Sequence, residues 1–454
     1  MNLSKILHLV GYVFYLGASL VARPIPLPAV YWMGRVAGHL GFFLMPMRRR
    51  LAVLNMTLAL GIPETEAREL TLQHFKNLGA NVLSMFKVPT MSDAAIWRHV
   101  TFEIGPHVPK EPGGKGWVAV FGHSSNWELL GRLTKLFPQY RFGALYRKLS
   151  NAAVNRHFNK NRARMGVQLF DRQEEFWDAV AFLESGGVLG VLSDQYAGVS
   201  GTWMPFFGRL TSTSTLAAAL AHRVDVPVVP IKISTIGWAR WHVSIGEPIP
   251  RGRSVEITTA SINDELEKQI RQSLPDWLWS HNRWKTPPLG FLFSANRQQT
   301  HLPEGFHVSK LVPYRILIRS VTEIEEARLA APSVLAIKRG RLDAHVTILA
   351  PEALVSFWQE IREVDNVISF TEGESPHHIA IRIRTAGNFD VGILLPENPD
   401  AAKEMVLAGV PIRLGSPRRK GLNHWQNPAG VPDPPIRGAE RYQRIANAAG
   451  AKVP

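Results

Sequence analysis

The residues with the clearest chemical potential lie in the segment GHSSNWELLG, residues 122–131. His123 and Glu128 stand five residues apart there, directly after the apolar run Trp117–Phe121. A short buried strand would deliver His123 to its carboxyl end, where open α/β sheets bind their ligands. Imidazole needs little tuning to act as a general base for a hydroxyl group near neutral pH. The pattern therefore predicts a base at a strand-to-helix switch.

A carboxylate on the second ring nitrogen would fix the tautomer of this base and stabilise the imidazolium that forms. Glu128 is the residue of the segment that we expect in this role. The sequence has no Gly-x-Ser-x-Gly elbow and no cysteine, so we expect the nucleophile to be a hydroxyl of the substrate. The predicted reaction is acyl transfer without a covalent enzyme intermediate, with His123 as the base.

The same segment also has a purely structural interpretation. Ser125-Asn-Trp-Glu128 fits a capping box, in which Ser125 caps a helix and Glu128 bonds back to the cap. Glu128 would then only start a helix, and His123 would only end a strand. Spacing alone favours this structural interpretation, and both interpretations use the same carboxylate.

Composition narrows the class of protein. The chain has 454 residues, which exceed the size of one ordinary core, so we expect two domains. Its mean hydropathy of −0.05 excludes a polytopic membrane protein. The absence of cysteine excludes a disulfide framework and Cys-ligated zinc, and no other cluster of metal ligands stands out.

Positive charge is the other compositional signal. The formal net charge of +15 predicts acidic partners. Residues 141–172 hold eight Lys/Arg against one acid, yet they lack periodic aromatic residues for stacking on bases. Anionic lipid headgroups and an acidic carrier protein therefore explain the charge better than nucleic acid does.

The most apolar segment, residues 6–22, lies in a basic part of the chain, since residues 1–63 contain six Lys/Arg and no acid. Its length is at the lower limit for a helix that spans a bilayer. A cleaved signal peptide and a buried helix are the alternatives. We expect an uncleaved anchor, with Arg23, Arg35 and the run Arg48–Arg50 facing anionic headgroups on the cytoplasmic side.

Five ordered blocks resemble the late acyltransferases of lipid A biosynthesis, the lauroyl/myristoyl transferase family. They are GHSSNWE at 122–128, YRK at 146–148 with the basic run after it, GVLGVLSDQ at 187–195, GTWMPFFG at 201–208 and PDWLWSHNRWK at 275–285. The resemblance covers residues 1–285. It implies transfer of a fatty acyl chain from an acyl carrier protein or CoA thioester, without a cofactor, to a hydroxyl of a lipid A precursor or related glycolipid. It also implies a location at the cytoplasmic face of the inner membrane.

The resemblance assigns roles to individual residues. It makes His123 the base and Glu128 its partner. Arg147 and Arg164 become candidates to hold a phosphate or carboxylate of the acceptor, which a guanidinium binds through two hydrogen bonds. The alternative for both arginines is a solvated basic helix face.

Other residues of the matching blocks are expected around the substrate. Asn126, Asp194 and Gln195 are candidate substrate-binding residues. Asp194 follows an apolar strand and would lie near the rim that carries the histidine, or else cap a turn. Phe206 and Phe207 are candidates for the wall of an acyl groove, with packing in the core as the alternative.

Residues 313–430 resemble the N-terminal half of heptosyltransferase-type glycosyltransferases, as in the segments RILIRS at 315–320 and DAHVTILAP at 343–351. The Gly-Asp of that family aligns here with Glu325-Glu326, and the remaining residues leave no room for its nucleotide-sugar half. We therefore expect a module for acceptor docking or stability. A non-catalytic lipid-binding or scaffold protein of envelope synthesis, and sugar transfer by this domain, are the alternatives for the function.

The expected architecture is an α/β protein, because residues 117–235 alternate helix-like segments with strand-like ones, among them 117–121, 142–146 and 188–192. It would combine an N-terminal membrane helix, an acyltransferase-type mixed sheet flanked by helices, and a second, smaller Rossmann-like α/β domain. The expected divisions are an anchoring segment at 1–50, the acyltransferase domain at 51–290, a linker at 291–312, the glycosyltransferase-like domain at 313–430 and a loose tail at 431–454.

Overall fold

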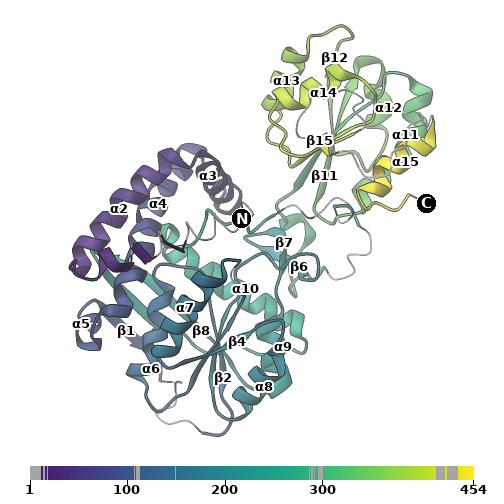
Figure 1. The fold of residues 1–454 in the computed structure, drawn as a ribbon. Helices are drawn as coiled ribbons and strands as arrows, with labels where there is room; N and C mark the ends of the chain where they lie inside the picture. The colour runs from purple at the N-terminus through teal and green to yellow at the C-terminus, as the bar shows by residue number, and fades with distance from the viewer. Residues whose placement is uncertain are drawn as a thin grey trace. The chain divides into compact units, whose positions relative to one another are not determined.

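The structure is a computed structural model that describes residues 12–13, 16–17, 19–106, 108, 113–148, 150–285, 287, 290, 292–294, 300–415, 425–426 and 438–453. The chain divides into two compact units (Figure 1), which we treat separately. The first unit comprises Met1–Phe207, Thr211–Lys285 and His301–Gly305, and the second comprises Gly208–Leu210, Thr286–Thr300 and Phe306–Pro454.

A seven-stranded mixed sheet organises the first unit, in the order β1-β9-β8-β2-β5-β3-β4. Every neighbouring pair is parallel except β8–β9, which is antiparallel. The strands are β1 Val100–Ile104, β2 Trp117–Phe121, β3 Phe142–Tyr146, β4 Val167–Asp171, β5 Val188–Leu192, β8 Val228–Gly237 and β9 Arg240–Ile245, and a separate pair consists of β6 Thr202–Phe206 and β7 Arg209–Thr213.

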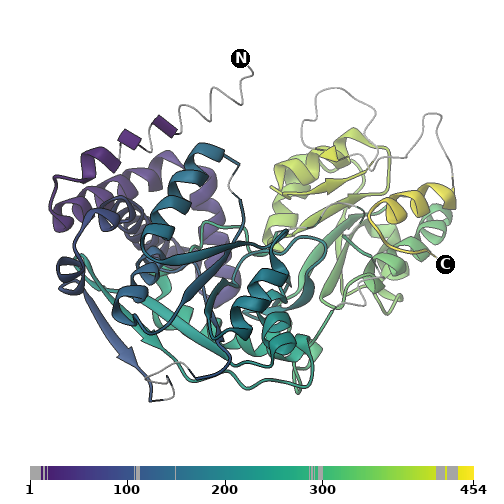
Figure 2. The same cartoon turned by 60° about the horizontal axis from the view of Figure 1, so that its bottom comes forward.

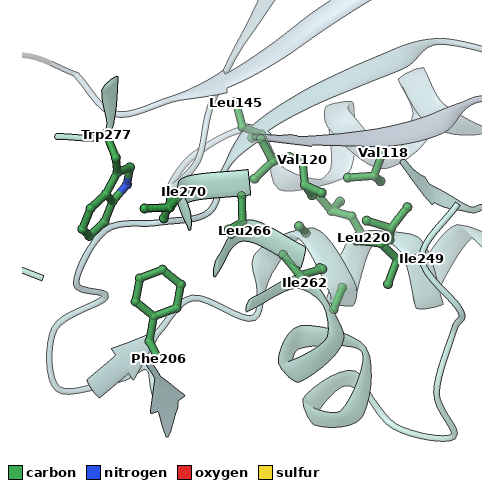
Figure 3. Packing of buried hydrophobic residues seen from close by; sticks show 14 of the residues in the cluster. Val118, Val120, Leu145, Phe206, Leu220, Ile249, Ile262, Leu266, Ile270 and Trp277 are labelled. Carbon is green, nitrogen blue, oxygen red and sulfur yellow. The ribbon is translucent and has the colours of Figure 1, made fainter. Parts of the chain in front are cut away.

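Helices cover both faces of this sheet, which explains why its central strands are apolar without alternation. In β2, Val118 and Val120 pack into one hydrophobic cluster, while Trp117 and Ala119 pack into the other. The first of these clusters includes residues of α9 and α10 (Figure 3). The helices are α2 Leu27–Leu44, α3 Pro46–Leu60, α4 Glu64–Lys87, α5 Asp93–Trp97, α6 Leu133–Leu136, α7 Ala152–Arg164, α8 Phe176–Glu184, α9 Leu216–Val224 and α10 Val255–Gln272, with 3₁₀ turns η1 Val88–Thr90, η2 Trp127–Arg132 and η3 Leu274–Asp276.

Helices α2 and α4 lie side by side (Figure 2) and approach closely through glycines. A Cβ atom on Gly34 would lie 2.5 Å from Cα of Ala80, so a side chain there would force the helices apart. Within the described part of the chain, no helix combines the length and the apolarity needed to cross a membrane. Most of the anchor expected at residues 6–22 lies outside the described residues.

The second unit contains a six-stranded parallel sheet in the order β12-β11-β10-β13-β14-β15. Numbered from the first strand of this unit, the order is 3-2-1-4-5-6, which is that of doubly wound dinucleotide-binding sheets. Its strands are β10 Tyr314–Arg319, β11 Ala344–Pro351, β12 Asn366–Phe370, β13 Val391–Leu394, β14 Arg413–Leu414 and β15 Trp425–Gln426, and its helices are α11 Ile324–Arg339, α12 Val355–Gln359, α13 Pro376–Thr385, α14 Pro399–Leu407 and α15 Ala439–Ala448, with 3₁₀ turns η5 Val308–Lys310 and η6 Glu352–Leu354.

The expectation of a loose tail is wrong for residues 439–448, which form α15. Tyr442 and Ile445 lie three residues apart and bury one helix face in the core of the second unit. The hydroxyl of Tyr442 donates a hydrogen bond to Glu326 at 3.0 Å, which ties α15 to the start of α11. One of the two acidic residues that depart from the glycosyltransferase pattern is therefore used in packing.

Candidate active site

A histidine–aspartate pair occupies the edge of the first sheet. β2 and β5 pair in parallel with Phe121 opposite Leu192, so the loops that follow them emerge at the same edge. There, Nδ1 of His123 lies 2.7 Å from Oδ1 of Asp194, and the backbone N–H of His123 donates to Oδ2 at 2.7 Å. Because a carboxylate can only accept, Nδ1 carries the proton, and Nε2 of the neutral ring is left as the basic atom.

The surroundings of Asp194 keep it ionised. Its side chain is 2% exposed, and it also accepts a hydrogen bond from the indole Nε1–H of Trp277 at 2.8 Å. Burial raises the pKa of Asp194, but the attraction of the imidazolium form of His123 and the hydrogen bonds from His123 and Trp277 outweigh it, so the pKa falls to about 2. An ionised carboxylate in this position can stabilise an imidazolium.

The basic Nε2 atom of His123 faces a large cavity. Gln195, on the rim, places its side-chain nitrogen 3.3 Å from this atom. The cavity has a volume of about 850 Å³ and lies over β2, β3 and β5, with η2 and α6 contributing to its walls. Its apolar lining includes Phe121, Leu130, Leu133, Phe142, Val188 and Leu192, and its polar lining includes Tyr146, Arg147, Asn155, Asn159, Arg162, Arg172 and Gln195.

Glu128 has a different partner from the one predicted. Its carboxylate accepts two hydrogen bonds from Arg162 of α7, at 3.2 Å from Nε and at 2.6 Å from Nη2. The prediction that Glu128 orients His123 is therefore wrong, because Nδ1 of the histidine is bonded to Asp194. Glu128 and Arg162 both line the cavity and form a charged pair beside the histidine.

The capping-box alternative is wrong as well. Ser125 has a φ angle of 51°, which is uncommon for a residue with a side chain, and its hydroxyl pairs with that of Thr235 at 2.8 Å. The 3₁₀ turn η2 starts only at Trp127, and Asn126 before it makes no side-chain capping bond. This tight turn carries Glu128 away from the backbone and toward α7.

Trp277 holds the pair from a distant part of the sequence. It belongs to the block 275–285, whose backbone also contacts the histidine loop: Ser125 N–H donates to Asp276 O at 2.9 Å, and Leu278 N–H donates to His123 O at 3.0 Å. Sequence reasoning did not assign Trp277 to the site. The signal that could have found it is the dense run of tryptophans in the last matching block.

Four predicted site residues lie elsewhere. Asn126 is fully buried, does not line the cavity and has no side-chain hydrogen-bond partner among the described residues. Arg164 is exposed on the last turn of α7 away from the cavity, because residues two apart on a helix differ in direction by about 200°. Arg162, which belongs to the same basic run and which sequence reasoning missed, lines the cavity instead. Phe206 and Phe207 pack in the core beside Trp277 and not on the cavity wall, so the groove assignment is wrong. Figure 3 shows Phe206 and Trp277 in this core.

Arg147, Asp194 and Gln195 do lie at the site. Arg147 and Gln195 are exposed on the cavity rim. Asp194 is not at the rim but beneath it, on the far side of the His123 ring.

The fold and the site together define an α/β enzyme with a histidine–aspartate pair at the mouth of a mainly apolar cavity. The family described as bacterial lipid A biosynthesis acyltransferase matches residues 2–286, which is more than half of the chain. The chain belongs to this family and is an acyltransferase of the lipid A type.

Individual relatives support the assignment. The chain is 25% identical over 285 residues to the lipid A biosynthesis lauroyltransferase of Escherichia coli strain K12, a match that covers 61% of this chain and 91% of that protein. It is 23% identical over 289 residues to the lipid A biosynthesis acyltransferase of Haemophilus influenzae, again covering 61% and 91%. The resemblance of residues 1–285 is thus confirmed at the level of the family.

A distant structural likeness concerns a glycosyltransferase. The solved structure of the Escherichia coli ADP-heptose lps heptosyltransferase II matches 22% of this chain and 30% of its own length, with 20% identity and a TM-score of 0.21. The role of the second unit stays a prediction.

Proposed function

We propose that this enzyme transfers a fatty acyl chain from an acyl carrier protein or CoA thioester to a hydroxyl of a lipid A precursor or related glycolipid. The observation that carries the proposal is the His123–Asp194 pair at the mouth of an apolar cavity of about 850 Å³. That volume lies in the range of ligand-binding cavities. Apolar walls favour a hydrocarbon chain, since each buried methylene contributes about 0.8 kcal/mol.

The pair supports a direct mechanism. Nε2 of His123 takes the proton of the acceptor hydroxyl while its oxygen attacks the thioester carbonyl carbon and forms the new C–O bond. The C–S bond of the resulting tetrahedral intermediate then breaks, and the leaving sulfur receives the proton from the imidazolium. Asp194 stays ionised throughout and stabilises the imidazolium through Nδ1–H.

The rim carries positive charge suited to anionic parts of the substrates. Arg147, Arg162 and Arg172 all line the cavity. Glu128 accepts two hydrogen bonds from Arg162, which fixes the direction of its guanidinium. Phosphate groups of the glycolipid acceptor, or the phosphodiester of an acyl carrier prosthetic group, match this arrangement.

A location at a membrane surface fits the exposed face of α2. Trp32, Val36, Leu40 and Phe43 lie on that face with exposures of 55%, 40%, 53% and 55%, at helical spacing. The basic run Arg48–Arg50 follows on α3. Apolar and cationic residues in this order favour the cytoplasmic face of an anionic bilayer, where the acceptor lipid would be found.

Transfer can be tested with the purified full-length chain, an acyl carrier thioester and a lipid A precursor, with product detected by mass spectrometry. We expect an acylated glycolipid, and a loss of about 10²–10⁴-fold in kcat when His123→Ala removes the base. His377→Ala in the second unit serves as the control. Transfer that survives His123→Ala unchanged would sink the proposed mechanism, and binding of the glycolipid without any transfer would favour the scaffold alternative.

A further inference from the structure

The floor of the cavity contains a row of three small residues on adjacent strands. Ala119 of β2 pairs with Gly190 of β5, and Gly190 pairs in turn with Ala144 of β3. Partners in parallel register point to the same face of a sheet. All three line the cavity, so the row crosses the floor at right angles to the strands.

Larger side chains stand on both sides of this row. Phe142 and Val188 pair with each other two residues toward the strand starts, and Phe121 and Leu192 pair with each other two residues toward the strand ends. All four also line the cavity. Alternate residues of a strand share a face, so the small row is a low strip of the cavity floor between two borders of larger side chains.

At the centre of the row there is little spare room for an added side-chain atom. A Cβ atom on Gly190 would lie 3.2 Å from Cε1 of Phe121 and 3.5 Å from the carbonyl oxygen of Gly143. Even a methyl group there would require the Phe121 ring to move. A branched side chain at this position, or a longer one at Ala144, would therefore fill the space above the row.

We propose that the Ala119–Gly190–Ala144 row sets the longest acyl chain that the enzyme accepts. The inference rests on the proposed function and concerns the same cavity. The thioester carbon must lie near His123, which follows the strand-end border, so the distal carbons of a chain that enters the cavity have to cross the small row. Filling the row excludes those carbons while leaving the reacting end unchanged.

The experiment uses a series of acyl carrier thioesters from octanoyl to palmitoyl and the full-length chain with Ala144→Leu or Gly190→Val. For each excluded methylene we expect about a fourfold loss in kcat/KM, so two methylenes lower the ratio of long-chain to short-chain kcat/KM by more than about tenfold. The kcat/KM for the shortest substrate should stay within about twofold of the original. The converse change, Phe142→Ala, lowers one border and should admit longer chains.

Ala181→Leu on the exposed face of α8 adds the same volume away from the cavity and should leave the length profile unchanged. If Gly190→Val melts well below the original protein, Ala144→Val repeats the test with a smaller addition. A uniform loss at all chain lengths, or an unmoved profile in an active enzyme, overturns this inference alone. Absence of transfer by the unchanged protein overturns the proposed function together with it.

Discussion

The indole Nε1–H of Trp277 donates a hydrogen bond to Oδ2 of Asp194 at 2.8 Å, and both side chains are buried, with exposures of 1% and 2%. The two residues are 83 positions apart in the sequence. The final matching block of the acyltransferase unit thus supplies a hydrogen bond to the carboxylate that holds the histidine.

This contact predicts a specific loss in Trp277→Phe. A hydrogen bond to a charged group contributes about 1.5–3 kcal/mol, so its removal should raise the pKa of Asp194 and lower kcat by roughly tenfold or more, with little change in KM. Trp279→Phe is the matched control, because its Nε1–H donates to the backbone oxygen of Leu274 at 2.7 Å and not to the pair. Equal effects of the two changes on kcat would contradict a positioning role for Trp277.

Gly122→Ala should disturb the pair by steric contact. A Cβ atom at Gly122 would lie 3.2 Å from Oδ2 of Asp194, so the carboxylate would have to shift by a few tenths of an ångström. A misplacement of about 1 Å at a reacting group can lower the rate by about 10²-fold, so for this smaller shift we expect a loss in kcat of up to about tenfold. Gly113→Ala, where nothing lies within 4 Å, should have the original kcat in the same assay.

The Glu128–Arg162 pair should act as a unit. Glu128→Gln and Arg162→Gln each break the double hydrogen bond, so we expect similar losses in kcat/KM for the acceptor, with the double variant little worse than either. Arg164→Gln, on the same helix but away from the cavity, should behave like the original protein. Independent losses that multiply in the double variant would show that the two residues have separate roles.

His74 should make the first unit sensitive to mild acid. Burial lowers its pKa from 6.5 to about 4, against weaker opposing hydrogen bonds to the backbone of the block that carries Trp277. Between these pH values, the unfolded chain therefore binds a proton at His74 that the folded protein does not. The contribution of His74 to the free energy of unfolding is therefore complete above pH 6.5 and is lost as pH falls toward 4. The free energy of unfolding that is lost in this way amounts to about 3 kcal/mol.

The measurement is the melting temperature between pH 7.5 and pH 5 for the original protein and for His74→Gln. The variant should lose much less stability than the original protein over this range. His377→Gln, on the second unit, should follow the original curve. A variant with the same pH dependence as the original protein would rule out His74 as the source.

Local patterns predicted the central strands well. The runs at 117–121, 142–146 and 188–192 are short and apolar, and they form β2, β3 and β5 with the same bounds. Such runs form strands because both of their faces are covered, and this requirement is visible in five consecutive residues. The tail was harder to predict, since α15 has only a narrow apolar face and depends on α11 for its burial.

Residue type predicted the positions of the site's side chains less well than local patterns predicted the strands. Phenylalanine suits a core and a cavity wall equally, so the sequence had no means to place Phe206 and Phe207. Similarly, a basic run on a helix contains several arginines, and only the phase of α7 against the sheet selects Arg162 over Arg164.

The sequence by itself determined that His123 stands at the end of a buried strand, and its ordered blocks determined the family. Those features depend on neighbouring residues and on their order. Only the tertiary structure decided which carboxylate serves the histidine, because Asp194 is 71 residues away in sequence and reaches it through the parallel pairing of β2 with β5. Glu128 is nearer in sequence, but the turn at Ser125 sends it to Arg162, and hydrogen bonding depends on direction as well as distance.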